Sequence, residues 1–186
     1  MARYIAFLRG INVGGHQVKM DDLRTSFEAL EFDNVATFIA SGNVIFEAGR
    51  AKPATLTARI ERQLRDSLGY EVPTFLRTDV ELARIPDHEP FADLQVSDGE
   101  SSYVAFLYER PTAAAAKKVM ALSNETDHVV VHDRELYWHV RGRMADSTLG
   151  PPVFEKALGS VPATVRNLNT VQRLAKKYPP ARAGRT

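Results

Sequence analysis

The sequence predicts an α+β protein made of two tandem ferredoxin-like halves, each a split β-α-β unit, the second with extra C-terminal helices. Two observations carry this prediction. The segment YIAFLRG at residues 4–10 returns as YVAFLYE at residues 103–109, and both copies have the β-branched and aromatic composition of a short buried strand. A helix pattern and a hairpin pattern follow each copy in the same order, which indicates a duplication.

The first half, residues 1–85, begins the order β-α-β-β-α-β. After the first strand, residues 21–30 carry apolar side chains at helical spacing behind two aspartates, which suit the positive end of a helix. Two strands at residues 35–39 and 44–46 then flank the small polar residues 41–43. Such residues tolerate positive φ angles, so they predict a hairpin.

A second helix is expected within residues 53–69, because apolar residues recur at every fourth position between a proline and a glycine. Residues 71–77 are expected to close the sheet. Residues 86–100 contain prolines and several acidic residues, a composition that favours a linker. Residues 179–186 are expected to form a flexible tail.

The second half, residues 101–178, repeats the beginning of this order. An alanine-rich helix is expected at residues 112–122 and a hairpin at residues 128–140. The end of this half is expected to differ. Helices at residues 151–159 and 168–178 are predicted to replace the closing strand.

Composition excludes several classes of protein. The chain has 186 residues and a net charge of +1, so no bulk field indicates a nucleic acid or an anionic membrane as partner. With 44% hydrophobic and 25% charged residues it can bury a core. It has no cysteine, which excludes disulfides, thiolate nucleophiles and cysteine-bound metals and fits a reducing compartment. The first apolar run is too short for a signal or a spanning helix, so a cytoplasmic protein without a membrane partner is expected.

The glycine-rich segment after the first strand is the first candidate site. Its backbone N–H groups could approach a phosphate or carboxylate closely, and Arg9 could supply a charged clamp. Asn12, Gly14 and Gly15 belong to the same segment. The spacing of its glycines matches neither nucleotide-binding fingerprint. A tight strand-to-helix turn with a solvated Arg9 is the simpler interpretation.

Two further polar segments have the same ambiguity. Ser41 and Asn43 offer hydrogen-bond donors to a ligand, but a hairpin tip also uses such residues for its backbone. Arg166 and Asn167 precede the last helix, where they could help to bind an anion. Alternatively, Thr164 or Asn167 caps that helix.

Histidines and aromatic residues give weaker signals. His128, His132 and His139 alternate on two predicted strands, but packed or solvated histidines are favoured over a metal site because no acidic residue has ligand spacing. The sequence therefore predicts no metal and no cofactor. His16 could act as an acid or base, although nothing fixes a partner for it. Aromatic residues on the predicted strands could stack nucleic-acid bases, but core packing is favoured because no RNP1-like run is present.

Four motifs together resemble one bacterial family, the domain of unknown function 1697, from about residue 4 to residue 178. They are LRGINVGG from Leu8, KM-x-x-L from Lys19, SGNVIF from Ser41 and T-x-R-N-x-N-T-V from Thr164. The resemblance implies a two-part α+β protein with ferredoxin-like halves and implies no assigned activity. The chain has Thr148 where the family usually has a lysine, and Glu89 in place of an asparagine.

Three functions remain open from the sequence. The favoured one is binding of a small anionic, nucleotide-like or nucleic-acid phosphate ligand in a cleft between the halves, although the net charge does not support a nucleic acid. It requires the loops that carry Arg9 and Arg166 to converge. A transferase or hydrolase acting on a phosphorylated or nucleotide substrate is the alternative, with unknown catalytic residues. The third is a non-catalytic scaffold, and no oligomeric state is predicted. The candidate ligand-binding residues are Arg9, Asn12, Gly14, Gly15, Ser41, Asn43, Arg166 and Asn167.

Overall fold

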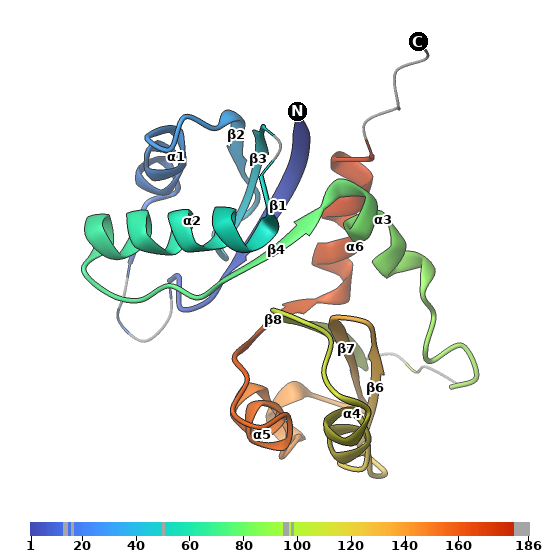
Figure 1. The fold of residues 1–186 in the computed structure, drawn as a ribbon. Coiled ribbons are helices and arrows are strands. Elements are labelled where there is room, and N and C mark those ends of the chain that lie inside the picture. The colour runs from blue at the N-terminus through green and yellow to red at the C-terminus, as the bar shows by residue number, and fades with distance from the viewer. Residues whose placement is uncertain (13–14, 16, 50, 95–96, 98, 181–186) are drawn as a thin grey trace. The chain divides into compact units, whose positions relative to one another are not determined.

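The structure is a computed structural model that describes the chain except for residues 13–14, 16, 50, 95–96, 98 and 181–186. Contacts divide the chain into two compact units. The first contains residues Met1–Arg84 together with the C-terminal segment from Leu174 onward, and the second contains residues Ile85–Arg173. Figure 1 shows the elements of both units.

The first unit has one four-stranded sheet with the strand order β2-β3-β1-β4, in which every neighbouring pair is antiparallel. Its elements in chain order are β1 (Ala2–Leu8), α1 (Met20–Glu28), β2 (Asp33–Thr37), β3 (Asn43–Ala48), α2 (Pro53–Leu68), β4 (Thr74–Thr78) and the start of α3 (Asp79–Asp87).

Helices α1 and α2 cover one face of this sheet (Figure 1). Alternate residues of β1 point to this face, and Tyr4, Ala6 and Leu8 pack there with apolar residues of both helices, among them Phe27 and Ile60. The α2 helix has a proline in its first turn and ends at a glycine with a left-handed backbone, as its sequence predicts.

The second unit has a second four-stranded antiparallel sheet with the order β6-β7-β5-β8. Its elements are β5 (Ser101–Leu107), α4 (Ala113–Met120), β6 (Asp127–His132), β7 (Glu135–Val140), a short 3-10 helix (Met144–Asp146), α5 (Pro151–Ala157), β8 (Ala163–Asn167) and α6 (Leu168–Lys177), whose last turn belongs to the first unit. Val119 of α4 and Phe154 of α5 pack with Trp138 in one core cluster, and the Trp138 and Phe154 rings meet edge to face at 5.4 Å.

The prediction of an α+β protein with two similar halves is confirmed, and the prediction for the end of the second half is wrong. Residues Ala163–Asn167 form the closing strand β8, which pairs with β5 as β4 pairs with β1. The helices that follow β3 and β4 are α2 and α3, and those that follow β7 and β8 are α5 and α6. In the part of the chain that the structure describes, the α-helices of the second half therefore match those of the first, with no extra C-terminal α-helix. Its closing strand escaped prediction because only five residues form it and three of them are polar.

Two predicted irregular segments also differ from the structure. The predicted linker at residues 86–100 begins inside α3, which extends to Asp87. The predicted tail at residues 179–186 begins with an ordered contact, because the Pro179 carbonyl accepts a hydrogen bond from Arg3 at 3.1 Å, and its last six residues lie outside the described part of the chain. Among the helices that the structure describes, none has the length and apolar composition to cross a bilayer.

Candidate functional site

The loop from β1 to α1 contains the first group of predicted site residues. Arg9 is partly exposed, Ile11 is buried, and Gly10, Asn12 and Gly15 have φ angles of 79°, 57° and 89°. An asparagine tolerates the left-handed region better than most residues, since its side chain can bond the nearby backbone. Gly14 and His16, which the sequence also singled out, lie outside the described residues.

Asn12 joins this loop to the β2–β3 hairpin. Its Nδ2 donates to the Ala40 carbonyl at 3.1 Å, and its Oδ1 accepts from the Val18 backbone N–H at 2.7 Å. The Leu8 N–H also donates to the Gly42 carbonyl at 2.8 Å. Described residues of the LRGINVGG and SGNVIF motifs, which lie far apart in the sequence, therefore contact each other. We call them the paired loops and define them as residues 8–12, 15, 17–19 and 38–43.

The hairpin part of the paired loops has an unusual backbone. Ile39 has a φ angle of 52° and is 42% exposed. A β-branched residue rarely adopts this conformation, which costs of order 1–3 kcal/mol and persists only where the surroundings impose it. Asn43 is fully buried, and its Nδ2 donates to the Phe38 carbonyl at 3.0 Å and to Ser41 Oγ at 2.8 Å. Asn43 thus holds the hairpin together from inside.

A cavity of about 410 Å³ lies against the paired loops and is lined by Asn12, Gln17, Val18 and Lys19. Lys19 is exposed and precedes the first turn of α1, so it brings a positive charge to the lining of the cavity. The same turn also contains the exposed carboxylates of Asp21 and Asp22. These carboxylates oppose anion binding at the end of the helix itself and leave the loop as the more favourable position.

The second unit contains the other two predicted site residues. Arg166 is buried, its Nη1 donates to Thr164 Oγ1 and to the Val165 carbonyl, both at 2.9 Å, and burial lowers the pKa of its guanidinium to about 10. The Oδ1 of Asn167 accepts the Asn169 N–H at 2.9 Å, which caps α6. Of the two residues that the sequence offered as caps of α6, Asn167 makes the capping hydrogen bond. The Thr164 side chain bonds Arg166 instead.

The three strand histidines lie on one face of the second sheet. His128 faces His139 across the β6–β7 pair with ring centroids 6.2 Å apart, and His132 stacks on His88 at 4.1 Å. Among the described residues, no group of three histidine, aspartate or glutamate side chains is placed to hold a metal ion.

Sequence reasoning missed three polar groups. Arg77 is 1% exposed and occupies in β4 the position that Arg166 occupies in β8, since they pair with Ile5 and Val104 of the repeated strand. The sequence signal for Arg77 was available, because Arg77-Thr78 directly precedes α3 as Arg166-Asn167 directly precedes α6. The Asp127 carboxylate accepts from Trp138 Nε1 at 2.7 Å and from Ser147 Oγ at 2.6 Å.

The third missed group is a chain of hydrogen bonds from Ser102 through His139 to Glu100. Local patterns in the sequence give no signal for it, because a serine and a histidine on different strands show no spacing that links them.

A family model matches the part of the chain that contains the first three motifs. The family model described as "Protein of unknown function (DUF1697)" matches residues 1–137, which contain the Met1–Arg84 part of the first unit and much of the second. The chain belongs to this family. A search of curated proteins found no match to this DUF1697 chain.

One similar solved structure is that of a conserved bacterial protein from Streptococcus pneumoniae. It aligns with a TM-score of 0.68 at 18% identity and covers 96% of this chain and 98% of that one. This likeness extends the shared fold over both units of the DUF1697 chain, and at this identity it supports the fold alone.

Proposed function

We propose that the first unit binds an anionic group, the phosphate or carboxylate of a small or nucleotide-like ligand or a nucleic-acid phosphate, at the paired loops. The observation that carries the proposal is the double hydrogen bond of Asn12, which fixes Asn12 and Val18 beside a cavity of about 410 Å³. The left-handed backbone at Asn12 and Ile39 supports it, since such strain gathers at binding sites.

Charge and hydrogen-bonding capacity also support this proposal. Arg9 and Lys19 both belong to the paired loops and both reach solvent. Ser41 Oγ accepts from Asn43 and keeps its own hydrogen to donate. These donors lie within the first unit, so the proposal does not depend on Arg166 or Asn167, whose side chains have the partners described above.

Calorimetric titration of the full chain tests this proposal with inorganic phosphate, a nucleoside triphosphate and a short single-stranded RNA as probes. At least one probe should bind, and Arg9→Ala should weaken it about tenfold or more, because a charge-assisted hydrogen bond contributes about 1.5–3 kcal/mol. A bound probe at 100 times its dissociation constant should also stabilise the fold by about 2.7 kcal/mol.

Arg24→Ala is the matched control, since Arg24 is an exposed arginine on α1 that pairs with Asp21 and Glu28. Equal loss in both variants, or no binding of any probe, would contradict the proposal and favour the scaffold. Turnover of a phosphorylated probe that Arg9→Ala abolishes would instead favour the transferase or hydrolase.

We further propose that each half is a ferredoxin-like unit and that the protein is cytoplasmic. The orders β2-β3-β1-β4 and β6-β7-β5-β8, with antiparallel neighbours and helices after the first and third strands of each half, support the first proposal. The lack of cysteine in the sequence supports the second.

A further inference from the structure

Three polar side chains of the second unit form a continuous chain of hydrogen bonds. Ser102 Oγ lies 3.0 Å from His139 Nδ1, and His139 Nε2 lies 3.0 Å from Glu100 Oε2. A hydroxyl, an imidazole and a carboxylate in this order are the groups with which enzymes activate a serine, and here the two ring nitrogens exchange the roles they have in the Ser-His-Asp triad. The arrangement belongs to the second unit alone and is independent of the paired loops.

The chemistry of the three groups fixes the position of the proton on the ring. The Ser97 backbone N–H, which bonds Oε2 at 3.1 Å, and then the bond to His139 hold the pKa of the Glu100 carboxyl below its ordinary value. Glu100 is therefore a carboxylate at neutral pH and can only accept. A neutral His139 must carry its hydrogen on Nε2, which leaves Nδ1 to accept the Ser102 hydroxyl hydrogen.

The sheet holds these groups in place. Ser102 and His139 are directly opposed in the β5–β7 pair, so both side chains leave the same face at adjacent positions. The His139 side chain is fully buried, with the Phe91 ring 5.5 Å away and the His128 ring 6.2 Å away. Ser102, in contrast, is only partly buried, so its hydroxyl stands at the solvent-facing end of the chain.

The N-terminus of α6 lies beside Ser102. In the β5–β8 pair Tyr103 opposes Asn167, and α6 begins at the next residue, Leu168, so the register places the first turn of α6 next to Ser102. The positive end of a ten-residue helix favours negative charge. Such a position can stabilise the oxyanion that forms when a serine attacks a carbonyl.

We propose that Ser102 is a nucleophile toward carboxylic esters, with His139 as its general base and Glu100 as the positioning residue. Ser102 Oγ attacks the carbonyl carbon while its proton moves to His139 Nδ1. The tetrahedral intermediate then breaks the bond to the alcohol, which leaves with that proton, and the acyl group stays on Ser102. Water then attacks this ester while His139 takes a proton from it. His139 returns that proton to Ser102 Oγ as the bond between Oγ and the acyl carbon breaks, which releases the carboxylic acid and restores the serine.

Covalent labelling of the full chain with a fluorophosphonate probe tests this proposal without a known substrate. Ser102 Oγ should displace fluoride from phosphorus, and fragment-ion mass spectrometry of the unmodified chain should place the adduct on Ser102. This readout needs no variant that might misfold. An adduct on another serine, or none at all, would overturn the proposal.

Variants then separate a nucleophile from a reactive surface hydroxyl. Ser102→Ala should abolish labelling, and Ser101→Ala, the neighbour on the opposite face of β5, should leave the rate unchanged. His139→Gln should slow labelling about 10²–10⁴-fold, the usual contribution of a general base. Unchanged circular dichroism and midpoints of thermal unfolding show that each variant is folded.

The role of Glu100 has its own readout. The titratable and charged groups near His139 are Glu100, His128 and, beside the carboxylate, Arg141. Glu100→Gln removes the negative partner of the imidazolium, so labelling should slow about tenfold or more and its pH midpoint should move to lower pH. An unchanged rate and midpoint would contradict the positioning role. Labelling of Ser102 and calorimetric binding of phosphate are measured separately, so this proposal and anion binding can fail independently.

Discussion

Gly42 lies where the two segments of the paired loops pack closely against each other. A Cβ built at this position would lie 3.0 Å from Ile11 Cβ and 3.2 Å from Leu8 Cβ, and the φ angle is +69°. We therefore expect Gly42→Ala to lower the free energy of unfolding by about 2–4 kcal/mol, since backbone strain and steric overlap add. Urea denaturation followed by circular dichroism measures the change.

Gly69→Ala is the control for this substitution. Gly69 has a similar φ angle of +81°, but no atom lies within 4 Å of the Cβ position, so the cost should be about 1 kcal/mol from the backbone alone. Equal costs at the two positions would show that the close approach of the loops contributes nothing to stability.

Arg166 shows at the residue scale why a local pattern misjudges a side chain. In the sequence it stands among polar residues and is a reasonable anion ligand. In the structure β8 buries its guanidinium, which bonds Thr164 and the Val165 carbonyl. Sequence patterns did not predict β8, and this strand places Arg166 in a buried position.

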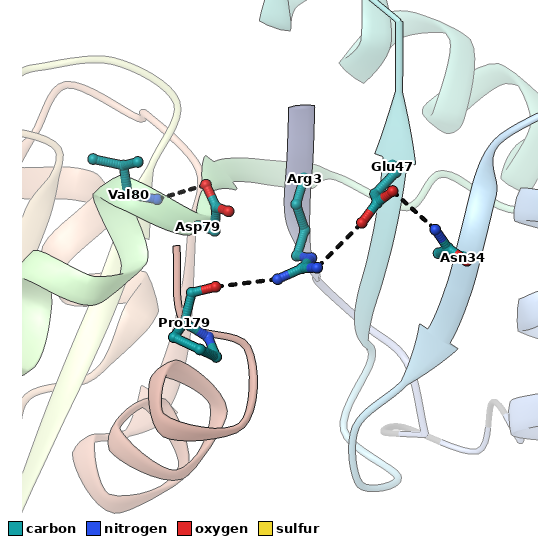
Figure 2. A network of polar contacts seen from close by, with 6 residues as sticks. All are labelled: Arg3, Asn34, Glu47, Asp79, Val80 and Pro179. Atoms are coloured by element: carbon teal, nitrogen blue, oxygen red, sulfur yellow. Dashed lines mark hydrogen bonds and ion pairs between the residues drawn. The ribbon is translucent and has the colours of Figure 1, made fainter. Parts of the chain in front are cut away.

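At the scale of elements, one network ties β1 to two strands and to the C-terminal segment. Arg3 and Glu47 are opposed in the β1–β3 pair and their Nη2 and Oε1 atoms lie 3.2 Å apart, while Asn34 Nδ2 donates to Glu47 Oε2 at 2.9 Å. Figure 2 shows Arg3 between Glu47 and the Pro179 carbonyl. Both charged side chains are mostly buried, so the pair is screened less than an exposed one.

This network predicts a loss of stability in acid. The hydrogen bond from Asn34, and then the contact with Arg3, hold the pKa of Glu47 below its ordinary value of 4.5. The unfolded chain therefore takes up the proton first, so the stabilisation is present above pH 4.5 and disappears as the pH falls through the lower pKa of the folded state. We expect Glu47→Gln to lower the free energy of unfolding at pH 7 by about 0.5–1 kcal/mol and to have a smaller effect at pH 3.

The control is Glu71→Gln, which removes an exposed carboxylate paired with Arg65. Its effect at pH 7 should be smaller than that of Glu47→Gln in the same urea titrations. If the two variants lose the same stability at pH 7 and at pH 3, the network at Glu47 has no special energetic role.

At the scale of the whole molecule, histidines should set the pH dependence of stability near neutrality. The second unit contains four of the five histidines, and burial is the main cause that lowers the pKa values of His88 and His128. The Nε2 atoms of both are buried with no hydrogen-bond partner among the described residues. The charged and titratable groups that act on these two histidines are His132, Glu135, Arg141, His139, Asp127 and Glu100.

The sign of this effect follows from the direction of the shifts. The unfolded chain binds protons at these histidines near pH 6.5 and the folded chain only at lower pH, so the free energy of unfolding should fall as the pH drops below 6.5. The double variant His88→Gln/His128→Gln should lose less stability between pH 7 and pH 5 than the unmodified chain in urea denaturation. An equal loss in both proteins would contradict the assignment.

The sequence alone determined the duplication, most of the elements and the composition of the paired loops. These features are local. The periodicity of apolar residues along the chain predicts a strand or a helix, and a few small residues predict a turn. The resemblance to the family also depends on short local motifs. The predicted ends of the elements differ from the observed ends by a few residues. The first hairpin strand, for example, was predicted at residues 35–39, and β2 spans Asp33–Thr37.

Which of these residues contact one another depends on how the strands and helices pack. The closing strand β8 exists because β5 pairs with it, although its five residues carry a weak pattern of their own. Ser102 and Glu100 reach His139 across 37 and 39 residues of sequence, and Asn12 reaches Ala40 across 28. Contacts of this kind depend on the register of the strands and on the burial of each side chain. The spacing of neighbouring residues in the sequence determines neither of them.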